Sequence, residues 1–291
     1  RGSSVYQQTL NLTISEKQKL RRLLEENYLP KNRVYRYNFF YDNCTTRARD
    51  IIEKCIEGKV VYSEGKEKLS FRDIVHQYTK GHEWDELGID MCLGSEADKP
   101  IDTRKQMFAP FYMLEAAKKA TIVVGDSVRP LILHEKKVVD VEPEDVREGF
   151  PLSPMVCVFI LIGVTCFVGW LQFKIRKIIW IWDLLLFGVQ GLAGCVITFL
   201  VFFSTHPTVG SNWLILLLNP IPLIYLPVMV YRAIKGKKDY YHTINIVCLT
   251  SFMMIMPFIQ QKFNVTVLPL ALCLLICSAN HVLLYYRQNN K

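Results

Sequence analysis

The hydrophobic pattern changes near residue 150 and divides the chain into two parts. Before that point, apolar residues recur at the spacings of short amphipathic helices and strands. After it, five apolar runs are each long enough to span a bilayer, roughly residues 154–173, 178–203, 212–231, 242–260 and 266–286. The pattern predicts an α+β domain over residues 1–150 and an all-α membrane domain of five transmembrane helices over residues 151–291.

Within the first part, the clearest predicted helix begins at Cys44. The residues after it place apolar side chains on one face, namely Ala48, Ile51, Ile52, Cys55 and Ile56. An aromatic, strand-like run over residues 35–41 comes before it and is followed by Asp42 and Asn43. Cys44 is therefore expected where a helix starts.

A cysteine at a helix start is a candidate nucleophile. Backbone N–H groups and the positive end of the helix dipole favour a thiolate there, and Arg47 and Arg49 are expected to add to that field. The alternative is structural: Asn43 or Thr45 caps the helix, and Cys44 is a small buried residue. Spacing alone leaves both interpretations open, because no base is adjacent in the sequence.

Other elements of the first part follow from capping and composition. Ser15 and Gln18 have the spacing of a capping box for an N-terminal helix. Residues 126–150 are rich in Val, Glu, Asp and Lys and have the composition of a linker with one strand-like piece, residues 128–133. His76 follows Arg72 by one helical turn and could face Cys44, although a structural role is commoner for a lone histidine.

Basic residues border the apolar runs mainly on one side, and the loops on the other side carry just one Lys. Those on the main side lie between the first and second runs, between the third and fourth, and after the fifth: Lys174, Arg176, Lys177, Arg232, Lys235, Lys237, Lys238, Arg287 and Lys291. The positive-inside rule places these loops and the C-terminus in the cytoplasm, with residues 1–150 outside. In a bacterium with two membranes, this means the inner membrane and the periplasm. The same residues supply much of the net charge of +8, so nucleic-acid binding is not expected.

Several polar residues of the membrane part are further candidates. His206 and Asn212 lie in an outer loop and could contact a lipid headgroup or substrate, although a histidine at a helix end is usually only an interface anchor. Asp183 lies inside the second run, where a carboxylate is a functional candidate, with snorkelling toward Lys177 as the alternative. The prolines of residues 219–222 should break the third run, and the broken backbone must then be buried in protein.

The cysteines give no sign of a metal or cofactor site. Six of the nine lie inside the apolar runs, where they behave as small hydrophobic residues. No C-x-x-C pair or Cys/His grouping has metal-ligand spacing, so neither a metal nor a cofactor is expected. A disulfide between Cys55 and Cys92 is left open by the sequence.

Five motifs, in order along the chain, resemble one bacterial family. They are the segment 35–52, F-R-D-I-V-H at 71–76, W-x-x-x-G-I-D-x-x-L-G at 84–94, R-K-Q-M-F-A-P from Arg104, and S-T-H-P-T-V-G-S-N-W-L-I-L-L-L-N-P at 204–220. Through them most of the chain resembles the Lnb-type lipoprotein N-acyltransferases. The periplasmic part of that family is similar to permuted papain-like enzymes such as lecithin:retinol acyltransferase, in which an Asn-Cys pair at a helix start supplies the nucleophile.

The resemblance implies a partial, permuted papain-like α+β domain facing the periplasm. It implies that Cys44 is the nucleophile, with support for the thiol or the oxyanion from Asn43, Thr45 and Asp42. Contacts to substrate or lipid are expected from a further set: Arg47, His76, His206 and Asn212. The catalytic histidine of the family lies earlier in its sequence, so we expect it upstream of Arg1, with residues 1–150 forming the C-terminal portion of the domain.

The reaction implied is acyl transfer in two steps. The Cys44 thiolate takes an acyl chain from a membrane phospholipid as a thioester, and the α-amino group of a diacylglyceryl-cysteine lipoprotein then accepts it.

Two other functions remain open. A membrane-anchored papain-like cysteine hydrolase acting on cell-wall peptides would need one membrane anchor, so five spans favour acyl transfer. A non-catalytic envelope membrane protein would use Cys44 structurally, and Cys44→Ala would leave its function intact.

Overall fold

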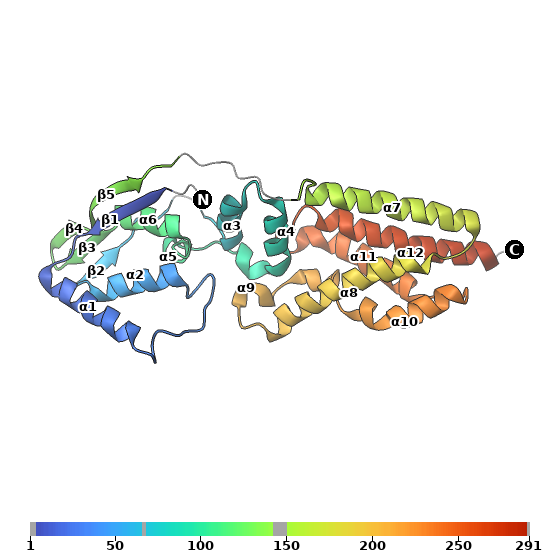
Figure 1. Ribbon diagram of the computed structural model, residues 1–291, viewed down its shortest axis with the longest axis horizontal. Coiled ribbons are helices and arrows are strands. Elements are labelled where there is room, and N and C mark those ends of the chain that lie inside the picture. The colour runs from blue at the N-terminus through green and yellow to red at the C-terminus, as the bar shows by residue number, and fades with distance from the viewer. Residues whose placement is uncertain (1–3, 66–67, 142–149, 290–291) are drawn as a thin grey trace. The chain divides into compact units, whose positions relative to one another are not determined.

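A computed structural model of the chain describes residues 4–65, 68–141 and 150–289, and these form two compact units (Figure 1). The first unit comprises Arg1–Ile74 and Pro100–Glu148, and the second comprises Val75–Lys99 and Gly149–Lys291. The first is α+β with small sheets, and the second contains the apolar helices, as the hydrophobic pattern predicts. Residues 75–99 group with the apolar helices although they precede residue 150 in the sequence.

The first unit packs helices against two small antiparallel sheets. Strand β1 (Val5–Leu10) pairs with β5 (Ile132–Val139), and a second sheet has the order β2 (Lys59–Val61), β3 (Thr121–Val124), β4 (Ser127–Pro130). The helices are α1 (Ile14–Tyr28), α2 (Cys44–Cys55), α5 (Thr103–Gln106), α6 (Pro110–Lys119) and the start of α3 (Phe71–Thr79). A buried core that includes Cys55, Ile122 and Leu131 joins α1, α2 and α6 to strands of both sheets.

The linker predicted over residues 126–150 is wrong for most of its described length. Residues 127–130 and 132–139 form β4 and β5, and β5 pairs with β1 from Val5↔Val139 to Leu10↔Ile132. Both strands of this pair are largely exposed, so their polar composition resembles that of a linker. Residues 142–149 of the same prediction lie outside the described residues.

Helix α1 begins with a capping box two residues earlier than expected. Thr13, not Ser15, is the N-cap, and Glu16, not Gln18, returns the hydrogen bond to its backbone. Glu16 is fully buried, and its carboxylate also accepts from the Glu57 N–H (2.9 Å) and from Arg129. Burial by itself raises the pKa of Glu16, but these hydrogen bonds outweigh it and the net pKa is lowered.

The second unit contains five helical spans of membrane length, in agreement with the five predicted runs. Among the described residues, helices long and apolar enough to cross a membrane are Pro154–Ile175, Trp180–Phe203, Pro207–Ile234, Tyr240–Phe258 and Val267–Gln288. They correspond to α7 (Pro154–Ile175), α8 (Trp180–Phe203), the broken set α9 (Pro207–Gly210), η2 (Trp213–Leu216) and α10 (Ile221–Ile234), then α11 (Tyr240–Ile255) with η3 (Met256–Phe258), and α12 (Val267–Asn289). Helix α8 packs against α10, and α12 packs against α7 and α11.

The third span is interrupted as its prolines predict. Helix α10 begins only at Ile221, after Pro220, and the preceding segment is partly 3₁₀. The irregular backbone is buried against α8: Gln190 donates to the Leu217 carbonyl (2.8 Å). A Cβ on Gly194 would lie 2.2 Å from the Asn219 carbonyl carbon, so glycine allows this close approach. Burial in protein thus satisfies the requirement for broken backbone at membrane depth.

Residues 83–98 join the apolar helices through backbone contacts. After α4 (Glu83–Cys92), the Gly94 N–H donates to the Thr208 carbonyl (2.7 Å), and the chain continues into η1 (Ser95–Asp98). Asn212 Nδ2 donates to the Met91 carbonyl (2.7 Å). A Cβ on Gly94 would lie 2.6 Å from the Ser211 carbonyl carbon. The motifs at 84–94 and 204–220 therefore contact each other, which gives both a structural role.

Candidate functional site

Cys44 is the first residue of α2, as predicted, and its side chain is exposed. In the described part of the chain, neither its thiol nor its backbone N–H makes a hydrogen bond. An exposed thiol at a helix N-terminus can approach a substrate, and an uncommitted N–H beside it can donate to one. The alternative of Cys44 as a small buried residue is thereby excluded.

Asn43 fixes the start of this helix through four hydrogen bonds. Its Oδ1 accepts from the Thr45 and Thr46 N–H groups, both at 2.9 Å, and its Nδ2 donates to the Phe39 and Phe108 carbonyls, both at 2.9 Å. The side chain is 4% exposed. Asn43 is therefore the N-cap, and it also joins the helix start to the backbone of the R-K-Q-M-F-A-P motif.

An aromatic cluster supports this connection. Phe40, Phe71 and Phe108 are buried, with ring centroids 4.6 Å apart for Phe40 and Phe71 and 5.0 Å apart for Phe40 and Phe108. Each ring comes from a different motif of the chain. Packing of these rings holds the Phe108 carbonyl where Asn43 can reach it, so three motifs converge beneath Cys44.

The backbone amide of Thr45 is not available for an oxyanion. Its N–H is taken by the Asn43 side chain, as is that of Thr46. The role expected for Thr45 as an oxyanion donor is thus not supported, because a capped amide is already paired. The Cys44 N–H is the first-turn donor that the cap leaves open.

The two arginines of α2 are paired with carboxylates. Asp42 accepts from Arg47 Nε (2.7 Å) and Nη2 (2.9 Å), and the Arg47 guanidinium lies 3.5 Å from the centre of the Tyr35 ring. Arg49 is buried and pairs with Asp50 at 2.7 Å. The arginines therefore add less positive field at Cys44 than the sequence suggests, because each is compensated. Asp42 holds Arg47 rather than contacting the thiol.

Tyr37 also belongs to the site. The strand expected over residues 35–41 does not form, and only an isolated bridge joins Asn38 and Asp42. Burial raises the pKa of the Tyr37 hydroxyl, and the neighbouring Cys44 adds to the rise. A tyrosine that keeps its proton beside the thiol can donate a hydrogen bond. Its place in the aromatic run just before Asn-Cys is the signal that could have identified it.

His76 has a partner other than Cys44. It belongs to the second unit, and its Nε2 lies 2.8 Å from Asp90 Oδ1. Asp90 is buried and also accepts from Asn264 Nδ2 (3.0 Å). These contacts give His76 a structural role in holding α3 and α4 to the loop before α12.

The two outer-loop candidates differ in accessibility. Asn212 is 3% exposed, and its amide is occupied by Met91, Leu214 and Gln261. His206 is half-buried at the N-cap of α9, and its side chain makes no capping bond. A substrate contact is thus open to His206 but would require Asn212 to give up existing bonds.

Two sets of side chains in the second unit group potential metal ligands, which the sequence did not suggest. Asp183, Cys277 and His281 form one, with their ligand atoms within 4.8 Å of one another, and His76, Glu86 and Asp90 form the other. Asp183 is fully buried and bonds His281 Nε2 at 2.8 Å, so it does not snorkel toward Lys177. All nine cysteines, Cys55 and Cys92 included, are free thiols.

Comparison with known proteins gives two matches to family models. Residues 1–80 match the Lnb N-terminal periplasmic domain, and residues 145–289 match the Lnb transmembrane domain. Neither the curated proteins nor the solved structures contain a significant match. The two matches occur in the order that the motifs and the five spans predict: the first includes the segment 35–52 and the motif at 71–76, and the second includes the five spans. The chain is therefore a membrane protein with a periplasmic domain and belongs to the Lnb-type family.

Proposed function

We propose that the protein is an apolipoprotein N-acyltransferase with Cys44 as its nucleophile. It moves an acyl chain from a membrane phospholipid to the α-amino group of a diacylglyceryl-cysteine lipoprotein. The observation that carries the proposal is the exposed, unbonded thiol of Cys44 at the capped start of α2, in a chain of the Lnb-type family. The papain-like character of the domain remains part of this proposal.

In the first step, the thiolate attacks the ester carbonyl of the phospholipid. The tetrahedral oxyanion forms beside the Cys44 N–H, which has no partner in the described part of the chain. Collapse breaks the bond to the glycerol oxygen, which takes a proton and leaves as lysophospholipid. The acyl chain remains on Cys44 as a thioester.

In the second step, the neutral α-amino group of the lipoprotein attacks the thioester carbonyl. The new C–N bond forms, the C–S bond breaks, and the thiolate is regenerated while the amine loses a proton. A general base is needed to activate the thiol and accept this proton. The family resemblance implies a histidine for this role, and His76 does not fit it because His76 is paired with Asp90.

Both substrates are anchored in a membrane, and this accounts for the five spans. A hydrolase of cell-wall peptides would require only one anchor. We place the spans in the bacterial inner membrane, with the C-terminus and the basic loops in the cytoplasm. The first unit then faces the periplasm, where lipoproteins carry their free α-amino group.

A reconstituted transfer assay tests the proposal. The full-length protein is placed in vesicles whose phospholipid carries a labelled acyl chain, and a synthetic diacylglyceryl-cysteine peptide is added. Mass spectrometry of the peptide should show one additional acyl amide, lost in Cys44→Ala and kept in Cys92→Ala, a matched control from α4. Transfer that persists in Cys44→Ala at normal abundance would exclude this nucleophile. Release of free fatty acid without amide formation would instead indicate a hydrolase.

A further inference from the structure

The loop between α10 and α11 and the last turns of α12 line a cavity that is open to solvent. It lies at the basic end of the bundle, since the contacts of residues 91–98 are made with loops at the other ends of these helices. No lining residue belongs to the unit that contains Cys44.

Three cations line this cavity: Arg232, Lys237 and Lys238. Within residues 4–65, 68–141 and 150–289, none of them forms an ion pair with a carboxylate, although several other surface cations do. The one acidic residue of the lining, Asp239, accepts from the Tyr225 hydroxyl and from the Tyr241 N–H. With three cations and one carboxylate, the lining carries an excess of positive charge.

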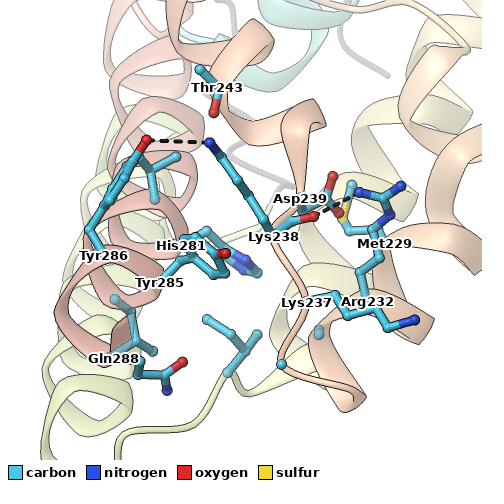
Figure 2. A pocket seen from close by; sticks show the side chains of 15 residues that line it. Met229, Arg232, Lys237, Lys238, Asp239, Thr243, His281, Tyr285, Tyr286 and Gln288 are labelled. Carbon is cyan, nitrogen blue, oxygen red and sulfur yellow. Dashed lines mark hydrogen bonds between the residues drawn. The ribbon is translucent and has the colours of Figure 1, made fainter. Parts of the chain in front are cut away.

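The cations are held in place by neighbouring groups. Figure 2 shows Lys238 and Tyr286 pointing toward each other, and their Nζ and Oη atoms are 3.4 Å apart. The Arg232 guanidinium donates to the Lys238 carbonyl (2.7 Å), which fixes the loop. Lys237 Nζ lies 5.3 Å from the centre of the Tyr231 ring. Contacts with uncharged groups order these side chains and leave their charges available to a ligand.

The remaining lining is largely apolar. Ile178, Met229, Ala233, Val282 and Leu284 contribute to it. The cavity lies at the end of a set of membrane-length helices and places cations beside aliphatic walls. This lining is complementary to a phospholipid, whose phosphate would contact the cations and whose glycerol region would contact the walls. Free phosphate would use the cations but not the walls. Basic cavities between transmembrane helices are known to hold anionic headgroups.

We propose that this cavity binds the phosphate-bearing headgroup of an anionic phospholipid from the leaflet next to the basic loops. The phosphate lies among Arg232, Lys237 and Lys238, and the glycerol and first acyl carbons contact the apolar wall. This lipid is a bound ligand of the helical bundle, independent of the proposed acyl transfer at Cys44.

Native mass spectrometry of the delipidated full chain tests the assignment. The ligands are short-chain phosphatidylglycerol, diacylglycerol of the same chain length, and inorganic phosphate. The variant is Lys237→Gln with Lys238→Gln, and the matched control is Lys174→Gln with Lys177→Gln, which removes the same charge from a basic loop outside the cavity. We expect one bound phosphatidylglycerol, with affinity about thirtyfold lower in the cavity variant and within about twofold of wild type in the control.

Each other outcome would overturn the assignment. Equal loss in both double variants would mean that overall surface charge attracts the lipid. Diacylglycerol that binds as well as phosphatidylglycerol would remove the role of the phosphate. Inorganic phosphate that binds as tightly as the lipid would make this a site for the free anion. The single variant Lys237→Gln changes an exposed side chain and serves if the double variant is unstable.

Discussion

Asn43→Ala should loosen the start of α2 and displace Cys44. The change removes an N-cap, which costs about 1 kcal/mol, and leaves the buried Phe108 carbonyl without its donor, which costs about 1–3 kcal/mol. Together these predict a loss of about 3 kcal/mol in local stability. The cost is concentrated where the proposed nucleophile lies.

Hydrogen exchange of the α2 amides is the suitable assay. All five tryptophans lie outside residues 1–74 and 100–148, so tryptophan fluorescence would not report on the first unit. A loss of about 3 kcal/mol corresponds to exchange that is faster by a factor on the order of 100 if these amides exchange through opening of α2. Alkylation of Cys44, followed by peptide mapping, should also change in rate.

Two further variants separate the contributions. Asn43→Asp keeps an acceptor for the Thr45 and Thr46 N–H groups but cannot donate to Phe108, so it should lose the second contribution only. Asn32→Ala removes a single exposed hydrogen bond and should change stability by less than about 0.5 kcal/mol. If Asn43→Ala exchanges no faster than Asn32→Ala, the account of the helix start is refuted.

Two other substitutions test the packing of each unit. Glu16→Gln should destabilise the first unit by about 3 kcal/mol at neutral pH, because it leaves Arg129 without its buried partner. Since folding lowers the pKa of Glu16, this contribution is present above the pKa of an unfolded glutamate and is lost as pH falls. The difference in unfolding free energy between variant and wild type, measured by urea denaturation, should therefore shrink in acid. A difference that stays constant with pH would contradict the assignment. Gly94→Ala should lower the thermal unfolding midpoint followed by tryptophan fluorescence, because its Cβ would clash with the Ser211 backbone at a cost of about 2 kcal/mol. Gly88→Ala, with nothing near its Cβ, should be neutral or stabilising. Equal effects of the two variants would contradict the close approach of Gly94 to Ser211.

Local signals predicted much of this fold and of the site. The five spans were visible as apolar runs, because a bilayer demands length and hydrophobicity from each helix alone. The start of α2 at Cys44 followed from the spacing of its apolar face. The interruption before α10 followed from its prolines.

The errors concern contacts between distant residues. The strand-like piece predicted at 128–133 overlaps β4 and the start of β5, but the rest of β5 is missed, because its partner β1 lies at the other end of the first unit in sequence and no local pattern reveals the pairing. For Asp183 the sequence leaves a functional role and snorkelling toward Lys177 both open, because its partner His281 comes from another helix. The Thr45 N–H donates to the Asn43 side chain and so is not open to an oxyanion. This could not be predicted from residue types, because it depends on the geometry of the N-cap.

The most direct test of the central claim is the intact mass of the full-length protein after incubation with phospholipid and no acceptor. The account predicts an increase by one acyl chain, labile to hydroxylamine, mapped to Cys44 and absent from Cys44→Ser. An active protein that transfers acyl chains but never carries this adduct, even when the reaction is quenched early, would contradict a Cys44 thioester.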